Sequence, residues 1–316
     1  MGHHARSPFH VKHFDPDSSP SPAVDTPLAA EVLDLTRRRR ILDAPAPPLP
    51  GATRVFTVSN QKGGVGKTTS AVNLAAAFAR LGARVLVIDL DPQGNASTAL
   101  SIPHSHDVPG IYDVLVNDVP LSQVVQRSPE VGELYCVPSN IHLAGAEIEL
   151  VADPESRFRL KAAVNEFLAG SPAPFHYVFI DCPPSLGLLT VNALVAAREV
   201  FIPIQCEYYA LEGVTQLEDT INRIGAALNP DLRLTTILLT MFDGRTRLAQ
   251  EVAENVRTHF PAQTLGTIIP RTVRVSEAPS YGQTILTYDP QSIGAVSYLE
   301  AAHEMANRHA ATTGRS

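Results

Sequence analysis

The sequence is poor in cysteine, in lysine and in long apolar runs. No apolar run approaches the roughly 20 residues of a membrane-spanning helix, and the N-terminus lacks the apolar core of a secretory signal. The three cysteines, Cys136, Cys182 and Cys206, include no C-x-x-C pair, which indicates reduced, buried thiols in a reducing compartment. A net charge of −7 and a mean hydropathy near zero fit a cytosolic protein and argue against a globally basic nucleic-acid-binding protein.

The few lysines are unevenly placed. Only four of the 25 basic residues are lysines, and two of them, Lys62 and Lys67, lie in the stretch "SNQKGGVGKTTSAVN" at 59–73. The general phosphate-loop pattern G-x-x-x-x-G-K-[ST] requires glycine where Gln61 stands. An additional lysine precedes Gly63 instead, so the loop departs from the general pattern at one position and gains a cation at another.

An apolar run precedes this stretch and an alanine-rich helical run follows it, which is the setting of a phosphate site. Glycines let the backbone approach an anion, and the N–H groups of the turn and of the helix N-terminus point at it. Lys67 is expected to reach the β- and γ-phosphates, Thr68 to bind Mg²⁺ and Thr69 to add a hydroxyl near the α-phosphate. The residues predicted to bind nucleotide here are Gly63, Gly64, Val65, Gly66, Lys67, Thr68 and Thr69.

Carboxylates end two of the expected strands. "RVLVIDLD" ends with Asp89 and Asp91, and "YVFID" ends with Asp181. Because α/β sheets bind ligands at the carboxyl ends of their strands, these side chains are expected beside the phosphate loop. Phosphoryl transfer to water needs carboxylates there, for the metal and for the attacking water.

Strand-like and helical runs alternate from residue 54 onward, which predicts an α/β fold of the P-loop NTPase type. Its largely parallel, twisted sheet is expected to carry helices on both faces. We predict a disordered, Pro/His-rich N-terminal tail over 1–53, one ATPase domain over 54–309 and a flexible end over 310–316. Within the tail, "EVLDLTRRRRIL" predicts a short amphipathic helix. Its arginines at 37–40 are either a solvated charge run, which is favoured, or a contact with DNA or a partner.

Five motifs occur in order along 54–308: "KGGVGKTT", "DLDPQGNAS", "DCPPSLGLLTVNAL", "QCEYYALEG" and "IPRTVRVSEAPSYG". Together they resemble the ParA/Soj chromosome-partitioning ATPases, whose phosphate loop is of the deviant Walker A type. The resemblance implies ATP and Mg²⁺ as cofactors and an ATP-dependent homodimer. In such a dimer Lys62 would cross the interface and contact the phosphates of the partner's nucleotide.

The resemblance also implies roles for single residues. Catalysis would involve Lys62, Lys67 and Asp91, with Asp91 positioning the attacking water. Thr68, Asp89 and Asp181 would hold the metal and its hydration shell. The "IPRTV" loop would contact adenine through Pro270 and Thr272.

Family members bind double-stranded DNA without sequence preference and act in chromosome or plasmid segregation with a ParB-type partner that stimulates hydrolysis. The resemblance therefore implies a cytoplasmic, nucleoid-associated protein with no membrane attachment. The matching DNA-binding positions are Arg245, Arg247, Arg271 and Arg274. The alternative is that these arginines pair with surface carboxylates such as Asp243 or Glu277.

Other classes share the phosphate motifs. A MinD-like membrane-positioning ATPase would end in a Lys/Arg-rich amphipathic helix, whereas this chain ends "YLEAAHEMANRHAATTGRS" with two arginines. An iron–sulfur carrier would need spaced cysteines, which Cys182 lacks. A P-loop metabolic kinase would leave Lys62 without a role. A diverged ParA paralogue with a different cargo remains open.

Overall fold

The computed structural model describes residues 34–36, 38–208 and 210–313. Residue contacts divide the chain into two units, residues 1–40 and residues 41–316. Of the first unit only 34–36 and 38–40 are described, so Arg37 of the arginine run lies outside the described residues. A short 3₁₀ helix, η1 (Arg39–Asp43), occupies part of the segment for which the sequence predicted an amphipathic helix.

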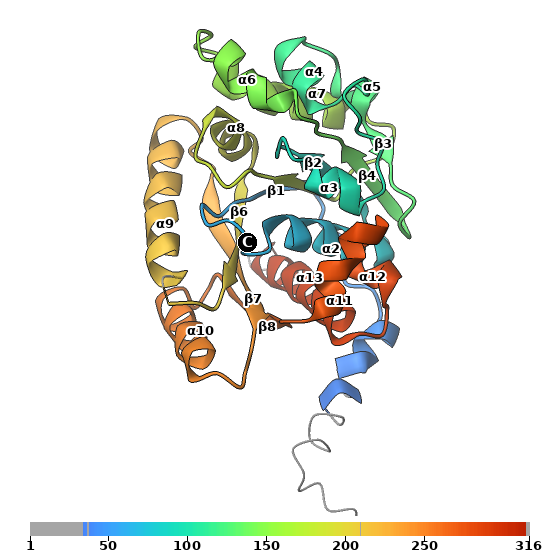
Figure 1. Ribbon diagram of the computed structural model, residues 1–316, viewed down its shortest axis with the longest axis vertical. Helices are drawn as coiled ribbons and strands as arrows, with labels where there is room; N and C mark the ends of the chain where they lie inside the picture. The colour runs from blue at the N-terminus through green and yellow to red at the C-terminus, as the bar shows by residue number, and fades with distance from the viewer. Residues whose placement is uncertain (1–33, 37, 209, 314–316) are drawn as a thin grey trace, which may run out of the picture. The chain divides into compact units, whose positions relative to one another are not determined.

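An eight-stranded sheet forms the centre of the second unit (Figure 1). Every neighbouring pair of strands is parallel except the edge pair β3–β4, which is antiparallel. In spatial order the strands are β3 (Gln126–Arg127), β4 (Glu133–Val137), β2 (Arg84–Asp89), β5 (Tyr177–Asp181), β1 (Arg54–Val58), β6 (Glu199–Gln205), β7 (Arg233–Phe242) and β8 (Thr264–Pro270).

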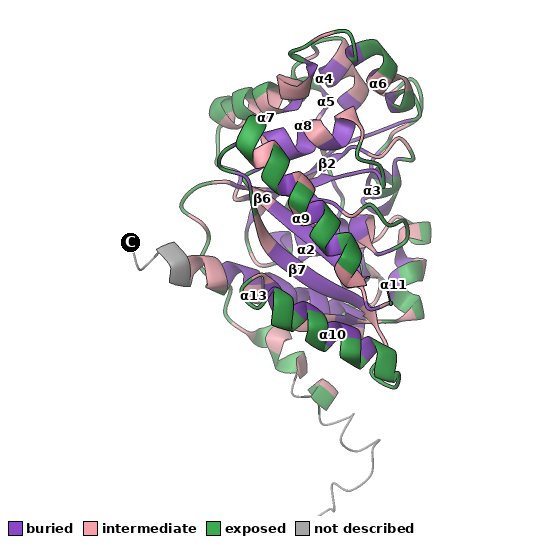
Figure 2. Cartoon of the chain, turned by 90° about the vertical axis from the view of Figure 1, so that its left-hand side faces the viewer, coloured by how far each residue is buried: buried purple, intermediate pink, exposed green. Residues whose placement is uncertain are grey.

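Helices cover both faces of the sheet. One layer consists of α2 (Lys67–Arg80), α3 (Asn95–Ala99), α11 (Val273–Glu277), α12 (Ile285–Tyr288), α13 (Ile293–Thr313) and the 3₁₀ helix η3 (Ala278–Tyr281). The other consists of α4 (Ile111–Val116), α5 (Leu121–Val124), α6 (Leu143–Leu150), α7 (Arg159–Gly170), α8 (Leu188–Ala196), α9 (Ala210–Ala227), α10 (Arg247–His259) and the 3₁₀ helix η2 (Ser156–Phe158). Figure 2 shows α9 and α10 with exposed outer faces and buried inner ones.

Alternate residues of the central strands pack against the two helix layers in turn. In β2, Val85 and Val87 belong to the cluster under α2, whereas Leu86 and Ile88 belong to the cluster under α7 and α8. This follows from the two-residue period of a strand, whose side chains point to opposite faces in turn. A strand that is apolar at every position therefore needs helices on both sides, as the sequence predicted.

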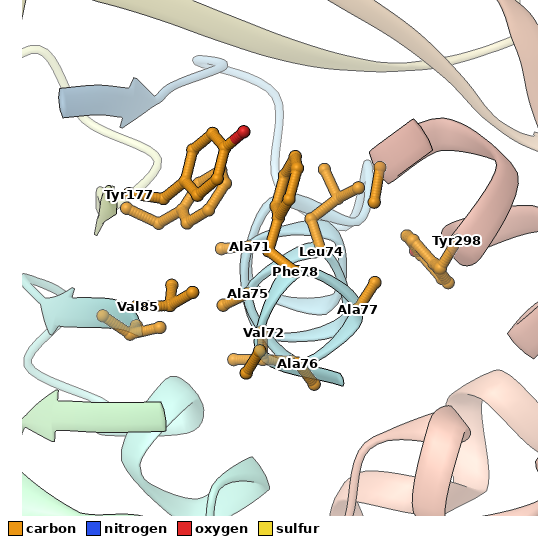
Figure 3. Packing of buried hydrophobic residues seen from close by; sticks show 14 of the residues in the cluster. Ala71, Val72, Leu74, Ala75, Ala76, Ala77, Phe78, Val85, Tyr177 and Tyr298 are labelled. Atoms are coloured by element: carbon orange, nitrogen blue, oxygen red, sulfur yellow. The ribbon is translucent and has the colours of Figure 1, made fainter. Parts of the chain in front are cut away.

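Helix α2, which follows the phosphate loop, is buried on most of its circumference (Figure 3). Its Phe78 stacks on Tyr177 of β5 with ring centroids 3.9 Å apart. The small buried residues Ala71 and Ala75 face the sheet, and Ala77 lies toward Tyr298 of α13. Because close packing fixes the helix against sheet and α13, the loop at its N-terminus has a rigid base.

The described unit extends beyond both ends of the predicted domain. Ile41 and Leu42, which composition placed in the tail, pack against the core cluster around α2. At the other end α13 continues to Thr313, past the predicted end at 309. Overall composition does not reveal where single apolar residues find a core, which is why the boundaries differ.

The α/β, largely parallel fold predicted from the sequence is confirmed, with two strands that the alternation did not reveal. β3 and β4 lie in 126–137, where no long β-branched run marks them. All three cysteines are buried and free. In the described part of the chain, no helix has the length and apolar character to cross a membrane.

Candidate functional site

The glycine-rich turn lies between β1 and α2, at the carboxyl end of the sheet. Gly64 and Gly66 have φ values of 74° and 87°, in the left-handed region that glycine enters without a steric penalty. Gly66 is the residue at the start of α2, and its carbonyl accepts the first helical hydrogen bond from the Ser70 N–H at 2.8 Å. The side chain of Lys67 is mostly buried, and its ammonium donates to the Lys62 carbonyl at 3.2 Å.

A cavity of about 480 Å³ opens in front of this turn. Its volume lies within the range of roughly 300–1,000 Å³ that small-molecule sites occupy. It is lined by Gly63, Gly64, Gly66, Lys67, Thr68, Thr69, Val72, Asp91, Asn95, Thr98, Ala99, Pro184, Met241, Pro279 and Ser280. The structure thus brings together the phosphate-loop residues and Asp91, which the sequence had predicted to share one site.

Two of the predicted loop residues do not line the cavity. Val65 is buried, and its carbonyl accepts a hydrogen bond from the Thr240 hydroxyl at 2.8 Å, so it anchors the loop to β7. Lys62 lies at the surface with about half of its side chain exposed, and its ammonium is paired with Glu207. The extra cation of the loop therefore lies outside the lining of the cavity that its own loop forms.

Asp89 and Asp181 end neighbouring strands and are register partners in the β2–β5 pair. Both side chains are fully buried. Asp89 accepts hydrogen bonds through both oxygens, whereas neither oxygen of Asp181 has a hydrogen-bond partner among the described residues. Two carboxylates thus lie side by side behind the cavity, and one of them is left unsatisfied.

Burial dominates the electrostatics of these groups. It raises the pKa of Asp181 well above its ordinary value, and the neighbouring charge of Asp89 raises it further. Thr68 lowers that pKa again, although the two groups form no well-aligned hydrogen bond. Burial also raises the pKa of Asp89 to about 6. It lowers the pKa of Lys67, although the negative charges of Asp181 and Asp91 act in the opposite direction and raise that pKa.

These residues fit a Mg²⁺ ion held together with a bound phosphate chain. No cluster of three or more His, Cys, Asp or Glu able to bind a metal occurs in the part of the chain that the structure describes. Mg²⁺ usually keeps several waters and binds through one or two carboxylates plus phosphate oxygens, so a complete protein cage is unnecessary. The unsatisfied Asp181 oxygens and the Thr68 hydroxyl supply the oxygen donors that such an ion prefers.

Pro270 and Thr272 do not line this cavity, and their contact with adenine stays a prediction. Pro270 ends β8, and the Thr272 hydroxyl caps α11 by accepting the Val275 N–H at 3.3 Å. Met241 lines the wall, and its φ of 50° is rare for a residue with a side chain. Sequence patterns give no signal for such a backbone conformation, so Met241 was missed.

Helix α3 and η3 contact each other beside the cavity, and both contribute lining residues that sequence reasoning missed. Just beyond them, the Ser101 hydroxyl donates to the Gly282 carbonyl at 2.7 Å. Gly282 has a φ of 63°, and a Cβ atom there would lie 2.3 Å from the Ser101 hydroxyl oxygen. The segment that follows the "IPRTV" motif is thus closely fitted to the loop that follows Asp91.

The four arginines predicted to bind DNA lie in two segments, the start of α10 with its preceding turn, and 271–274, which lead from β8 into α11. Arg245 pairs with Asp243 at 2.7 Å, and Arg274 approaches Glu277 at 3.8 Å. Arg247 pairs with Glu251 at 2.7 Å. The ion pairs considered as the alternative to DNA binding therefore do form. Exposed ion pairs add little stability, so they do not prevent the arginines from turning to phosphates.

A strand, a glycine-rich turn and a helix N-terminus that open onto carboxylates at the sheet edge define a P-loop nucleotide-binding protein. A family model described as an AAA domain matches residues 53–234. The chromosome partitioning protein ParA of Myxococcus xanthus is 49% identical over 81% of this chain and 88% of its own length. The sporulation initiation inhibitor protein Soj of Bacillus subtilis is 48% identical over 80% of this chain and 98% of its own length. The chain belongs to the ParA/Soj family of chromosome-partitioning ATPases.

Solved structures share the fold. Cobyrinic acid a,c-diamide synthase of Mycobacterium smegmatis, with bound ADP and magnesium, is 37% identical and has a TM-score of 0.70 over 82% of this chain and 96% of that chain. The cell division ATPase MinD of Pyrococcus furiosus is 23% identical, with a TM-score of 0.66 over 80% of this chain and 98% of that chain. The second likeness concerns the fold alone.

Proposed function

We propose that this chain is a ParA-type ATPase that forms a dimer around Mg²⁺–ATP, binds DNA without sequence preference and hydrolyses ATP to drive chromosome or plasmid segregation. It would work in the cytoplasm at the nucleoid, with a ParB-type protein that stimulates its turnover. The names of the curated relatives, chromosome partitioning protein and chromosome-partitioning ATPase, support this assignment.

The observation that carries the proposal is the position of Lys62. A lysine that served its own nucleotide would line the cavity, as Lys67 does. Lys62 instead lies half-exposed at the surface against Glu207. A cation in that place is useful where a second anionic nucleotide faces it, which happens when two copies of the chain bring their loops together.

The other residues of the site have separate roles in hydrolysis. The N–H groups of the turn and Lys67 would bind the phosphates, and Thr68 with Asp181 would hold the metal and its waters, with Asp89 beside Asp181 in register. When bound, Mg²⁺ offsets the negative charge that develops on the phosphate oxygens. Asp91 lines the cavity beside the loop and orients the attacking water. Little covalent chemistry is required of the protein, since phosphoryl transfer depends mainly on positioning and charge.

DNA binding is assigned to Arg245, Arg247, Arg271 and Arg274. All four are exposed, and none contributes to the phosphate loop. Contact with the DNA backbone is local, so an acidic protein can bind it through a few converging arginines.

Retention of the purified protein on duplex DNA, measured with and without ATP across a range of salt concentrations, tests the proposal. Arg245→Ala and Arg274→Ala should each weaken binding to any duplex and flatten the slope of log affinity against log salt by roughly 0.9. Arg127→Ala is the matched control, because Arg127 is an exposed, ion-paired arginine on the edge strand β3. ATP should be saturating, so that loss of the dimer cannot imitate loss of contacts. Unchanged affinity and slope in both variants would remove these arginines from the DNA surface.

A further inference from the structure

Ser97 of α3 is fully buried beside Asp89. Its hydroxyl donates to Asp89 Oδ2 at 2.7 Å, and its N–H donates to the same oxygen at 2.9 Å. The hydroxyl oxygen in turn accepts the Ser139 N–H at 3.1 Å, from the loop after β4. Ser97 does not line the cavity, so it acts on the site only through the groups that it holds.

The other oxygen of Asp89 contacts the loop that carries Asp91. Asp89 Oδ1 accepts the Asp91 N–H at 3.2 Å. The Asp91 carbonyl accepts the Gly94 N–H at 2.9 Å, which closes the turn that leads into α3. A continuous chain of hydrogen bonds therefore runs from Ser139 through Ser97 and Asp89 to the backbone of Asp91.

This chain of hydrogen bonds gives the two buried carboxylates, Asp89 and Asp181, different roles. Asp89 has both oxygens engaged, and two of its three hydrogen bonds come from Ser97. Asp181 lies opposite it in register and has neither oxygen engaged among the described residues. Asp181 is therefore the carboxylate that is available to the metal and its waters, whereas both oxygens of Asp89 are engaged by Ser97 and by the backbone of Asp91.

We propose that Ser97 is a positioning residue for ATP hydrolysis: through Asp89 it fixes the backbone of Asp91 and hence the place of the attacking water. The inference rests on the hydrolytic part of the proposed function and not on DNA binding. It assigns Ser97 an effect on turnover and little effect on the binding of Mg²⁺–ATP, because the phosphate loop and Asp181 are untouched by it.

The test is a graded series, Ser97→Cys and Ser97→Ala. Alanine removes the hydroxyl, and cysteine keeps a similar shape with a weak S–H donor. A hydrogen bond to a charged group is worth enough to change a rate constant by about 10-fold or more. Single-turnover hydrolysis should therefore fall by about 10-fold in Ser97→Ala and by less in Ser97→Cys.

Binding is measured separately, by titrating each variant with a fluorescent ATP analogue, with Mg²⁺ and with EDTA. The Mg²⁺-dependent affinity should stay within about 3-fold of wild type, since no group that touches the nucleotide has changed. Ser128→Ala is the matched control. Ser128 is buried, and its hydroxyl donates to the Leu100 carbonyl at the end of the same helix at 2.9 Å, without contacting a carboxylate.

A rate constant within about 2-fold of wild type in Ser97→Ala overturns the inference, as does an equal loss in Ser128→Ala. A loss of Mg²⁺-dependent affinity that accounts for the whole loss of turnover also overturns it, because Ser97 would then act on the metal. Should Ser97→Ala fail to fold, Ser97→Cys decides, with the same two readouts. If wild type itself does not hydrolyse ATP, it is the proposed function that fails.

Discussion

Replacing Asp181 with asparagine should make the protein without nucleotide or Mg²⁺ more stable while it abolishes hydrolysis. The Asp181 side chain is fully buried, and both of its oxygens lack a hydrogen-bond partner among the described residues. The Asp181→Asn variant would keep the shape of the side chain and remove the group that burial and the Asp89 charge make costly to ionise. Hydrolysis should be lost because the amide cannot take over the metal-side role of the carboxylate.

The size of the effect follows from proton linkage. The folded-state pKa of Asp181 is raised, so the folded protein holds this proton at pH values where the unfolded chain has released it. Wild-type stability therefore falls as pH rises from about 4 toward the folded-state pKa, by up to about 1.4 kcal/mol per pH unit. The Asp181→Asn substitution removes this dependence, so the advantage of the variant over wild type should grow as pH rises through that range.

Urea unfolding of both proteins, without Mg²⁺ or nucleotide, measures this difference at several pH values. The urea midpoint of the variant should exceed that of wild type at neutral pH, by a margin that grows as pH rises. Asp219→Asn on the exposed side of α9 is the control, with an expected change below about 0.5 kcal/mol at every pH. A constant difference between wild type and the Asp181→Asn variant across the pH range, or a variant that is less stable than wild type at neutral pH, would refute the reasoning.

Three further predictions concern residues away from Asp181. Lys62→Ala should retain ATP binding but lose ATP-dependent dimerisation and hydrolysis, because Lys62 lies outside the cavity. Size-exclusion chromatography with ATP measures this, and a dimer as abundant as in wild type contradicts it. Asp91→Ala should bind Mg²⁺–ATP without turnover and stay on DNA, as followed by nucleotide binding and DNA retention. Failure to bind nucleotide would make Asp91 a metal or folding residue. Arg54→Ala should cost about 3 kcal/mol in unfolding free energy without changing nucleotide affinity, because it leaves the mostly buried Glu199 without its two-pronged ion pair. A cost below about 1 kcal/mol in urea unfolding would show that the pair is negligible.

The fold was predictable where each local pattern had one meaning. Apolar strands that end in Asp89 and Asp181, separated by helical runs, require a parallel sheet with the two carboxylates at one edge. The short edge strands β3 and β4 were not predictable, because two to five residues without a β-branched run carry too little pattern.

The same contrast applies to the site. The phosphate loop and Asp91 were found because glycine, lysine and aspartate at fixed spacing have few other uses. Ser97 was missed because its role depends on a tertiary contact with the buried carboxylate of Asp89. Met241 was missed because its left-handed backbone conformation leaves no pattern in the sequence. The outward position of Lys62 agrees with its predicted role across a dimer interface, which stays a prediction.

The contact between Ser101 and Gly282 has a consequence for protein engineering. Any side chain at 282 would collide with the Ser101 hydroxyl and would also have to adopt a φ of 63°. Ser101 itself has a φ of 52°, so glycine is a tolerable replacement at 101. That replacement would have to come first, because it removes the hydroxyl that a side chain at 282 would meet. Positions 181 residues apart therefore constrain the order in which they can be substituted. A chimera that introduces a side chain at 282 must therefore also make room at 101.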